Sequence, residues 1–136
     1  MLIRAGIALL IVALGFGAYI FGTRWQVSRV SRRQYGTEIL AGLRAGIPAI
    51  IYFWSESCAP CKAVQSPAVR EISAKLGPKN LQVIEINALQ NPEIADAWGV
   101  LGLPTTFIVD ATGQPRHVNH GVARAEQLER QLAVLG

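Results

Sequence analysis

The sequence is poor in charge, and its first quarter has no acidic residue. Only 16% of the 136 residues are charged and 51% are hydrophobic, a balance that excludes a disordered chain. Residues 1–33 carry five arginines and no acid, whereas residues 34–136 carry eight basic and nine acidic residues, a net charge of −1. The overall charge of +4 therefore belongs to the N-terminal segment. Since the rest lacks the basic surface of a DNA- or RNA-binding protein, we expect no nucleic-acid partner.

Charge is also missing from one long apolar run. Residues 5–22 (AGIALLIVALGFGAYIFG) contain no charged side chain, and a run of this length reaches the lower limit for a membrane-spanning helix, roughly 17–25 residues. Tyr19, Phe21 and Trp25 lie near its end, and aromatic side chains favour the membrane–water interface. The pattern predicts one N-terminal transmembrane helix, with residues 1–33 forming an anchor with a basic flank.

A cleaved secretory signal is the main alternative for this run. Such a signal needs small residues at positions −3 and −1 of the cleavage site. Cutting after Ala18 puts Phe16 at −3, and cutting after Gly22 puts Ile20 there. The run is also longer than the roughly 7–15 residues of a signal core. Neither cysteine lies near its end, which excludes a lipoprotein anchor. We therefore favour an uncleaved single-pass anchor in the cell membrane.

The arginines around the run are unevenly distributed. Arg4 precedes it, whereas Arg24, Arg29, Arg32 and Arg33 follow it. Because basic flanks tend to stay in the cytoplasm, this imbalance favours a cytoplasmic C-terminal domain and leaves an extracytoplasmic domain as the alternative. The same four arginines can bind anionic headgroups, so membrane lipid is an expected partner.

Beyond residue 33 the hydrophobic pattern alternates between strand and helix periods. The run AIIYFW at 49–54 is continuous, as in a strand buried on both faces. Pro67 falls inside a helical pattern and predicts a kink. Asn91 and Pro92 have the types expected of an N-cap and a first-turn proline. The expected helices are 34–45, 59–76, 91 to about 99 and 123–135, and the expected strands are 49–54, 81–87, 105–109 and 116–120.

This order of elements predicts an α/β fold in one domain, residues 34–136. The first two strands are separated by a helix and should be parallel, joined by a right-handed crossover. The last two strands are separated by the turn DATG at 110–113 and should form an antiparallel hairpin. We expect a mixed four-stranded central sheet flanked by helices on both faces.

The two cysteines, Cys58 and Cys61, lie where the first buried strand ends and the kinked helix begins. A thiol at a helix N-terminus faces unsatisfied N–H groups and the positive end of the helix dipole, and both favour the thiolate. The C-x-x-C spacing places the second sulfur one turn away, where it can attack a mixed disulfide formed by the first. Pro60 suits the first turn, whose N–H groups have no intrahelical partner.

Three other interpretations of the cysteine pair are weaker. A structural disulfide would close a tiny loop and constrain the unfolded chain little. A zinc site could add His117 and His120, but residues three apart on a strand point to opposite faces. Two inert buried thiols conflict with polar Ser57 and Lys62 beside them. Redox chemistry, without a metal, is the favoured interpretation.

Residues 49–136 resemble the thioredoxin family in a series of landmarks with the right order and spacing. These are Phe53-Trp54 before the motif Cys58-Ala59-Pro60-Cys61-Lys62, then Pro67, Asn91-Pro92, the segment GVLGLPT at 99–105, Gly113 and Gly121. The resemblance implies a thioredoxin-like fold without an extra N-terminal strand, and the apolar run lies outside it.

The resemblance also implies roles for particular residues. Cys58 matches the nucleophile and Cys61 the resolving thiol. Pro104 matches a cis-proline that presents the backbone of Leu103 to an extended substrate segment, although a proline that merely begins a strand is the simpler interpretation. Trp54 packs beside the motif in the family, and core packing alone would also explain it. Residues around Cys58 complete the implied substrate-binding surface, namely Ser57, Ala59 and Pro60.

Several positions depart from the family pattern. Ser57 replaces the usual Trp before the nucleophile, and Ala59 replaces a Gly. Tyr52 replaces a buried acid, and Glu85 replaces the Lys that pairs with it. Our hypothesis is that Glu85 lies beneath Cys61, is hydrogen-bonded by Tyr52, has a pKa raised by burial and accepts the proton of Cys61. The alternative is that its strand turns Glu85 toward solvent.

We therefore expect a membrane-tethered thiol–disulfide oxidoreductase that reduces protein disulfides through a mixed disulfide. The expected partners are protein thiols and disulfides, an upstream thiol reductant and membrane lipid. No cofactor is expected beyond the redox-active Cys58–Cys61 disulfide. In an extracytoplasmic domain the same chemistry could serve cytochrome maturation or disulfide repair. A redox-silent adaptor that binds peptides at Pro104 is the alternative from another functional class.

Overall fold

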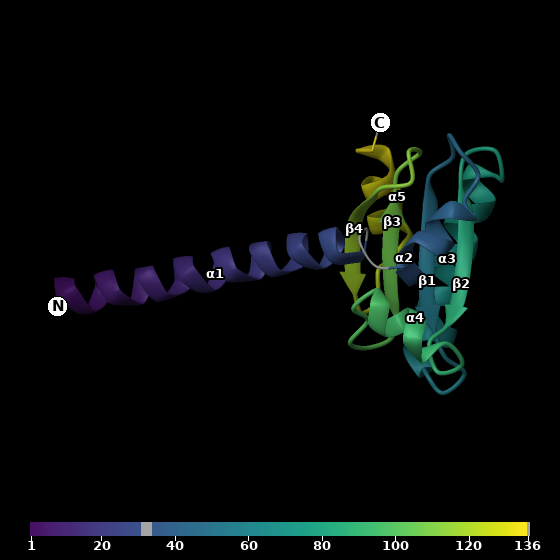
Figure 1. The fold of residues 1–136 in the computed structure, drawn as a ribbon. Coiled ribbons are helices and arrows are strands. Elements are labelled where there is room, and N and C mark those ends of the chain that lie inside the picture. Colours follow the sequence, from purple (N-terminus) through teal and green to yellow (C-terminus); the bar gives the residue numbers. More distant parts are fainter. Residues whose placement is uncertain (31–33, 136) are drawn as a thin grey trace.

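The computed structural model describes residues 1–30 and 34–135, with side chains described for 1–25 and 38–135. The prediction of membrane orientation depends partly on Arg29, Arg32 and Arg33. The side chains of these three arginines lie outside the described residues. The elements are α1 (Leu2–Val30), α2 (Gln34–Ala41), β1 (Ala49–Trp54), η1 (Cys61–Gln65), α3 (Ser66–Leu76), β2 (Gln82–Asn87), α4 (Pro92–Ala97), β3 (Thr105–Val109), β4 (Pro115–His120) and α5 (Ala125–Ala133) (Figure 1).

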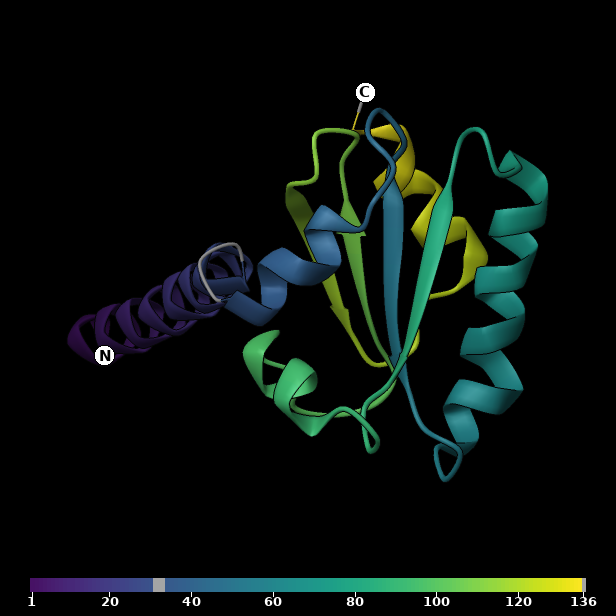
Figure 2. The ribbon, with the colours of Figure 1, turned by 45° about the vertical axis from the view of Figure 1, so that its right-hand side comes forward.

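The four strands form one sheet in the order β2-β1-β3-β4. β1 pairs in parallel with β2 and antiparallel with β3, and β3 pairs antiparallel with β4. The mixed sheet, the parallel β1–β2 pair and the final hairpin are therefore confirmed. All helices except α1 lie on the two faces of this sheet (Figure 2).

β1 is buried along nearly its whole length because both faces of the sheet are covered. Ala49, Ile51 and Phe53 belong to the apolar cluster against which residues of α2 and α4 pack. Ile50 and Tyr52 belong to the opposite cluster, which residues of α3 and α5 complete. This alternation follows from the two-residue period of a strand, and it explains the continuous apolar run in the sequence.

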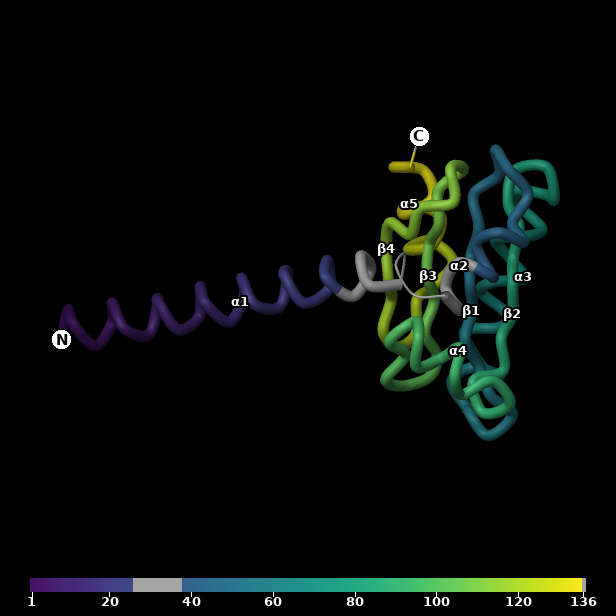
Figure 3. The backbone as a smooth tube through the Cα atoms, viewed as in Figure 1, coloured from purple at the N-terminus to yellow at the C-terminus, as the bar shows by residue number. Residues whose placement is uncertain are grey.

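α1 extends away from the sheet and carries the N-terminus at its far end (Figure 3). Its contacts with the domain include β4, one of the two edge strands. Among the described residues it is the one helix long and apolar enough to cross a membrane, with a candidate span of 24 residues, Leu2–Trp25. A signal sequence meets the same criterion of length and composition.

The helix expected over 59–76 is confirmed, but it begins irregularly. Five residues, Cys61–Gln65, form a π-helix, and the Ser66 N–H donates to the carbonyl of Cys61, five residues back. Pro67 explains the change, because proline has no N–H to continue the ordinary ladder and its ring crowds the preceding turn. The kink predicted at Pro67 thus takes the form of a wider turn just before it.

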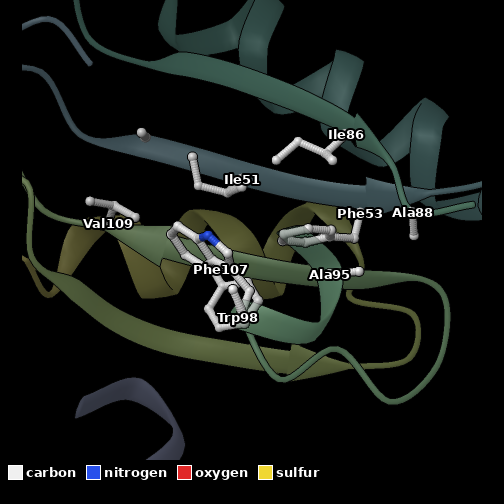
Figure 4. Close-up of a cluster of buried hydrophobic side chains, with 10 residues drawn as sticks. Ile51, Phe53, Ile86, Ala88, Ala95, Trp98, Phe107 and Val109 are labelled. Carbon is white, nitrogen blue, oxygen red and sulfur yellow. The ribbon is translucent and has the colours of Figure 1, made fainter. Parts of the chain in front are cut away.

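Trp98 is the centre of an aromatic cluster on the α2–α4 side of the sheet (Figure 4). Its ring lies 4.8 Å from that of Phe107 and 6.0 Å from that of Phe53, measured between centroids. Phe53 and Phe107 also contact each other, with centroids 5.8 Å apart. Trp98, which follows α4, thus fixes that short helix to the centre of the sheet.

The turn between β3 and β4 is organised by the buried carboxylate of Asp110. Its Oδ1 accepts hydrogen bonds from the N–H and hydroxyl of Thr112, at 2.9 and 2.6 Å, and from the N–H of Gln114 at 3.0 Å. Its Oδ2 accepts from the Arg116 Nε–H at 2.6 Å. Burial raises the pKa of Asp110, but these hydrogen bonds outweigh it and lower the pKa to about 2. The ionised form is therefore the one the fold stabilises.

Asp110→Asn is expected to lower the free energy of unfolding by about 2 kcal/mol at neutral pH, from the shift between about 3.8 and about 2. Because the folded-state pKa is the lower one, this stabilisation is present above about pH 4 and is lost as the pH falls toward about 2. Urea unfolding of the full chain in detergent micelles across that range measures the difference. Asp96→Asn, at an exposed position of α4, is the control. A constant difference at all pH values would contradict the assignment.

Candidate active site

The candidate site lies where the carboxyl end of β1 meets the amino end of β3, at the lower end of the sheet in Figure 1. Phe53 pairs with Thr105 in the antiparallel register. The loop after Trp54 carries Cys58, and the loop before Thr105 carries Pro104. The sheet therefore brings together the two motifs that the sequence places more than forty residues apart.

Cys58 and Cys61 are joined by a disulfide, with their Cα atoms 5.3 Å apart. Cys58 is half-buried, whereas Cys61 is completely buried, with 0% exposure. Helix begins at Ala59, directly after Cys58, and the Cys61 N–H donates to the Cys58 Sγ at 3.2 Å. An N–H donor at a helix N-terminus stabilises negative charge on sulfur. Cys58 is thus the accessible sulfur with a favourable environment for a thiolate.

The neighbours of Cys58 are mostly open to solvent. Ser57, Ala59 and Pro60 are exposed, and the Ser57 hydroxyl lies 3.3 Å from that of buried Ser55. Pro60 has helical backbone angles in the first turn, as expected. Trp54 is half-buried and packs against the cluster that contains Cys61.

The peptide bond between Leu103 and Pro104 is cis, which confirms the expectation from the resemblance. Hydrogen bonds hold the segment on both sides, because the Thr105 hydroxyl donates to the Gly102 carbonyl at 2.7 Å and the Gly121 N–H donates to the Pro104 carbonyl at 2.9 Å. Pro104 is buried and Leu103 is half-buried. Leu103 packs against the cluster of Cys61, so this loop lies beside the redox pair.

The hypothesis that Glu85 lies buried beneath Cys61 is wrong. Glu85 is exposed on β2, the edge strand opposite β4. Tyr52 pairs with Glu85 in the parallel register, but its hydroxyl is directed elsewhere, to the Cys61 carbonyl at 3.3 Å and the Ser66 hydroxyl at 3.0 Å. The strand turns Glu85 toward solvent, as the alternative predicted.

Tyr52 holds the backbone of Cys61 rather than a carboxylate. Burial raises the pKa of Tyr52; the hydrogen bond with Ser66 acts against this, and the negative charge of Glu85 adds to it. The phenol therefore stays protonated at neutral pH, when it can donate to the Cys61 carbonyl. The same carbonyl accepts the Ser66 N–H in the π-turn, so Tyr52 and Ser66 together fix the position of the second cysteine.

Two residues of this neighbourhood were not found from the sequence. Nothing in the hydrophobic pattern of the sequence indicates that Ser66 is a hydrogen-bond partner of Tyr52. Gln65 is completely buried, and its amide forms two hydrogen bonds with the backbone of Ala123, at 2.9 and 2.8 Å. The π-turn places Gln65 inward in line with Cys61, whereas Val64 before it is only half-buried. The turn itself could have been suspected from Pro67.

Across the described ranges 1–30 and 34–135, no group of three or more His, Cys, Asp or Glu side chains comes together in a way that could hold a metal ion. His117 and His120 both lie on β4, half-buried and exposed respectively.

Comparison with known proteins gives consistent matches. The family model Thioredoxin matches residues 26–134. The thioredoxin of Rickettsia bellii is 32% identical over 81 residues, which cover 60% of this chain and 72% of that protein. The thioredoxin of Rhodospirillum rubrum is 39% identical over 66 residues, which cover 48% of this chain and 62% of that protein.

A solved structure described as "Structure of a malarial protein" shares the fold, with a TM-score of 0.60 at 17% identity, and covers 65% of this chain and 96% of that one. The family match spans most of the chain and includes both cysteines and Pro104. The chain therefore belongs to the thioredoxin family, and with its Cys58–Cys61 pair it is a thiol–disulfide oxidoreductase that acts on protein thiols and disulfides.

Proposed function

We propose that this protein is a membrane-tethered protein-disulfide reductase, with residues 1–33 as the tether and residues 34–136 as the redox domain. The observation that carries the redox part is the asymmetry of the cysteine pair. Cys58 is accessible and accepts the Cys61 N–H on its sulfur, whereas Cys61 is fully buried. Such an arrangement supports a first attack by Cys58 and an internal attack by Cys61.

The reaction begins from the dithiol form. The Cys58 thiolate attacks one sulfur of a protein disulfide, a bond from Cys58 to that sulfur forms, and the other sulfur leaves as a thiolate that takes up a proton. Cys61 then loses its proton and attacks the Cys58 sulfur. The Cys58–Cys61 bond forms, the mixed disulfide breaks and the second substrate thiol leaves. Two electrons pass from the pair to the substrate, so an upstream thiol reductant must restore the dithiol.

The substrate is proposed to lie along the loop of Leu103 and Pro104, with Trp54, Ser57, Ala59 and Pro60 around the attacked sulfur. The exposure of Ser57, Ala59 and Pro60 leaves the approach to Cys58 open. Leu103 packs against the buried cluster that contains Cys61. An extended segment could therefore pair with the Leu103 backbone while its disulfide meets Cys58.

The tether is supported by the length and composition of α1. The arginines after the span favour a cytoplasmic domain, where low-molecular-weight thiols keep the compartment reducing and reduction of substrates is the expected direction. An extracytoplasmic domain would run the same exchange on disulfides outside the cell.

The redox function is tested by reduction of insulin disulfides, with the full chain in detergent micelles and dithiothreitol as the reductant. The wild type is expected to accelerate the appearance of insulin aggregation, and Cys58→Ser is expected to reduce the rate to that of dithiothreitol alone. Lys79→Ala, at an exposed position before β2 and at the end of the sheet opposite the cysteine pair, serves as the control. A wild-type rate equal to the background would contradict the proposal.

A further inference from the structure

We infer that the β4 edge of the domain and the loop at residues 101–103 rest on the phospholipid headgroup layer, so that the Cys58–Cys61 site works at the membrane surface. The inference rests on the proposed tether. It goes further because it assigns a lipid-contacting surface within the redox domain itself.

α1 contacts the domain directly. It meets β4 at the edge of the sheet (Figure 1). Two hollows of similar volume lie along this contact. The first, of about 640 Å³, is lined by Ala18, Tyr19, Gly22 and Thr23 of α1 and by Leu101, Gly102, Leu103, His120 and Gly121 of the domain. The other is lined by Tyr19, Thr23 and Arg24 together with Pro115, Arg116, His117 and Val118.

The candidate span is long enough for its end to reach the headgroups. A hydrocarbon core of about 30 Å takes about 20 helical residues at about 1.5 Å each. The candidate span Leu2–Trp25 has 24 residues, so its last turn reaches the headgroup layer. Ala18, Tyr19, Gly22, Thr23 and Arg24 line the hollows with the domain, and they belong to the last two turns of the span. The part of α1 beside the domain therefore lies where the helix passes from the hydrocarbon into the headgroups, so that the β4 edge faces the membrane surface.

Exposed apolar side chains lie beside this contact. Outside α1, the large apolar side chains exposed among the described residues are Leu89, Leu101, Val122 and Val134. Leu101 is 90% exposed and lines the first hollow, and Val122, 41% exposed, follows Gly121 of the same hollow. Two of the four thus lie where the membrane would be. Apolar side chains at that depth enter the boundary between headgroups and acyl chains.

The β4 edge carries basic side chains. β4 carries Arg116, His117 and His120 and no acidic residue, and Arg24 lies on the α1 side of the same contact. The Arg116 guanidinium also donates to buried Asp110, so its charge is partly balanced there. Basic side chains within a Debye length of the surface are attracted to anionic lipid. Charge and apolar exposure therefore favour the same occupant, an anionic bilayer.

The position of this lipid-contacting surface affects which disulfides reach the redox site. Leu103 lines the first hollow and also packs against the cluster that contains Cys61, with Cys58 at its edge. The loop that contacts the headgroups is thus continuous with the loop that precedes Pro104. The disulfides best placed for attack by Cys58 are those held close to the membrane surface.

Photocrosslinking in lipid vesicles tests this surface. The full chain, with benzoylphenylalanine at position 101, is placed in vesicles of phosphatidylcholine and phosphatidylglycerol. Position 89 is the matched control, since Leu89 is also exposed (67%) but follows β2, at the opposite edge of the sheet. Position 11, in the middle of α1, reports insertion. We expect the lipid adduct at 101 to exceed that at 89 by about fivefold or more. Equal yields at 101 and 89, with a strong adduct at 11, would overturn the inference.

A kinetic comparison separates this inference from the redox function. Two substrates are used, soluble insulin and an oxidised two-cysteine peptide attached directly to a phosphatidylethanolamine headgroup. Leu101→Asp is expected to slow reduction of the lipid-linked peptide by about threefold or more and to leave insulin reduction unchanged, because an acid at this surface is repelled by anionic lipid. Leu89→Asp should change neither rate. No reduction of insulin by the wild type would sink the proposed function, whereas an unchanged rate of Leu101→Asp on the lipid-linked peptide would sink only the surface.

Discussion

Cys61→Ser is expected to accumulate a stable mixed disulfide through Cys58 when the protein meets an oxidised protein substrate. The chain has two cysteines, so this variant has no second thiol to release the substrate. Cys58 is half-buried and receives the Cys61 N–H, which the serine variant retains. The thiolate should therefore form readily and stay bonded to its substrate. Non-reducing electrophoresis and intact mass, before and after dithiothreitol, measure the adduct.

Cys58→Ser is the matched control for the trap. The remaining Cys61 is completely buried, so its adduct should form roughly tenfold or more slowly than that of Cys58. The double variant, with serine at both positions, should form none. Equal adduct yields from the two single variants would contradict the division of roles between an attacking and a resolving sulfur.

Trp98→Ala is expected to lower the free energy of unfolding by about 3–5 kcal/mol. The side chain is completely buried and its ring contacts both Phe53 and Phe107, so truncation leaves a cavity in the cluster that joins α4 to the sheet. A loss of this size is a large part of the total stability of a small domain. Thermal unfolding of the full chain in micelles should show a midpoint lower by roughly 12 °C or more.

Trp98→Phe is the control for this cavity. The Trp98 Nε1 has no hydrogen-bond partner among the described side chains and backbone, so the phenylalanine variant gives up ring volume and no hydrogen bond that the structure describes. It should cost clearly less than the alanine variant. A cost below about 1 kcal/mol for Trp98→Ala would show that the cluster does not hold the fold together.

The strands could be predicted because their pattern reports burial directly. The continuous apolar run of β1 indicated a strand covered on both faces, and the turn residues at 110–113 indicated the hairpin. Where the structure differs from the expectation drawn from the sequence, local hydrogen bonds decide the outcome. Helix α4 begins at Pro92 as expected, but the Asn91 side chain donates to the Asn87 carbonyl rather than capping the helix. Sequence spacing cannot distinguish these two uses of an asparagine.

The cysteines and Pro104 could be predicted because their chemistry fixes residue type and spacing together. The environment of Cys61 could not, because it depends on where side chains of neighbouring elements point. The sequence showed that Tyr52 replaces the family's buried acid, but the strand register alone did not say that Glu85 would face solvent. Nor did it show that the π-turn would aim the Cys61 carbonyl at the Tyr52 hydroxyl. That turn arises from Pro67 and contains one residue more than a regular helical turn. A hydrophobic pattern read over the whole helix does not reveal a single extra residue.

The central claim is that Cys58 and Cys61 exchange two electrons with protein disulfides. The most direct measurement mixes fully reduced full chain with oxidised insulin without added reductant, quenches the exchange with acid, and counts free thiols by alkylation and mass. The account predicts that each insulin disulfide reduced is matched by the loss of two thiols, those of Cys58 and Cys61, and by the appearance of their disulfide. A pair that keeps both thiols while insulin stays oxidised would contradict it.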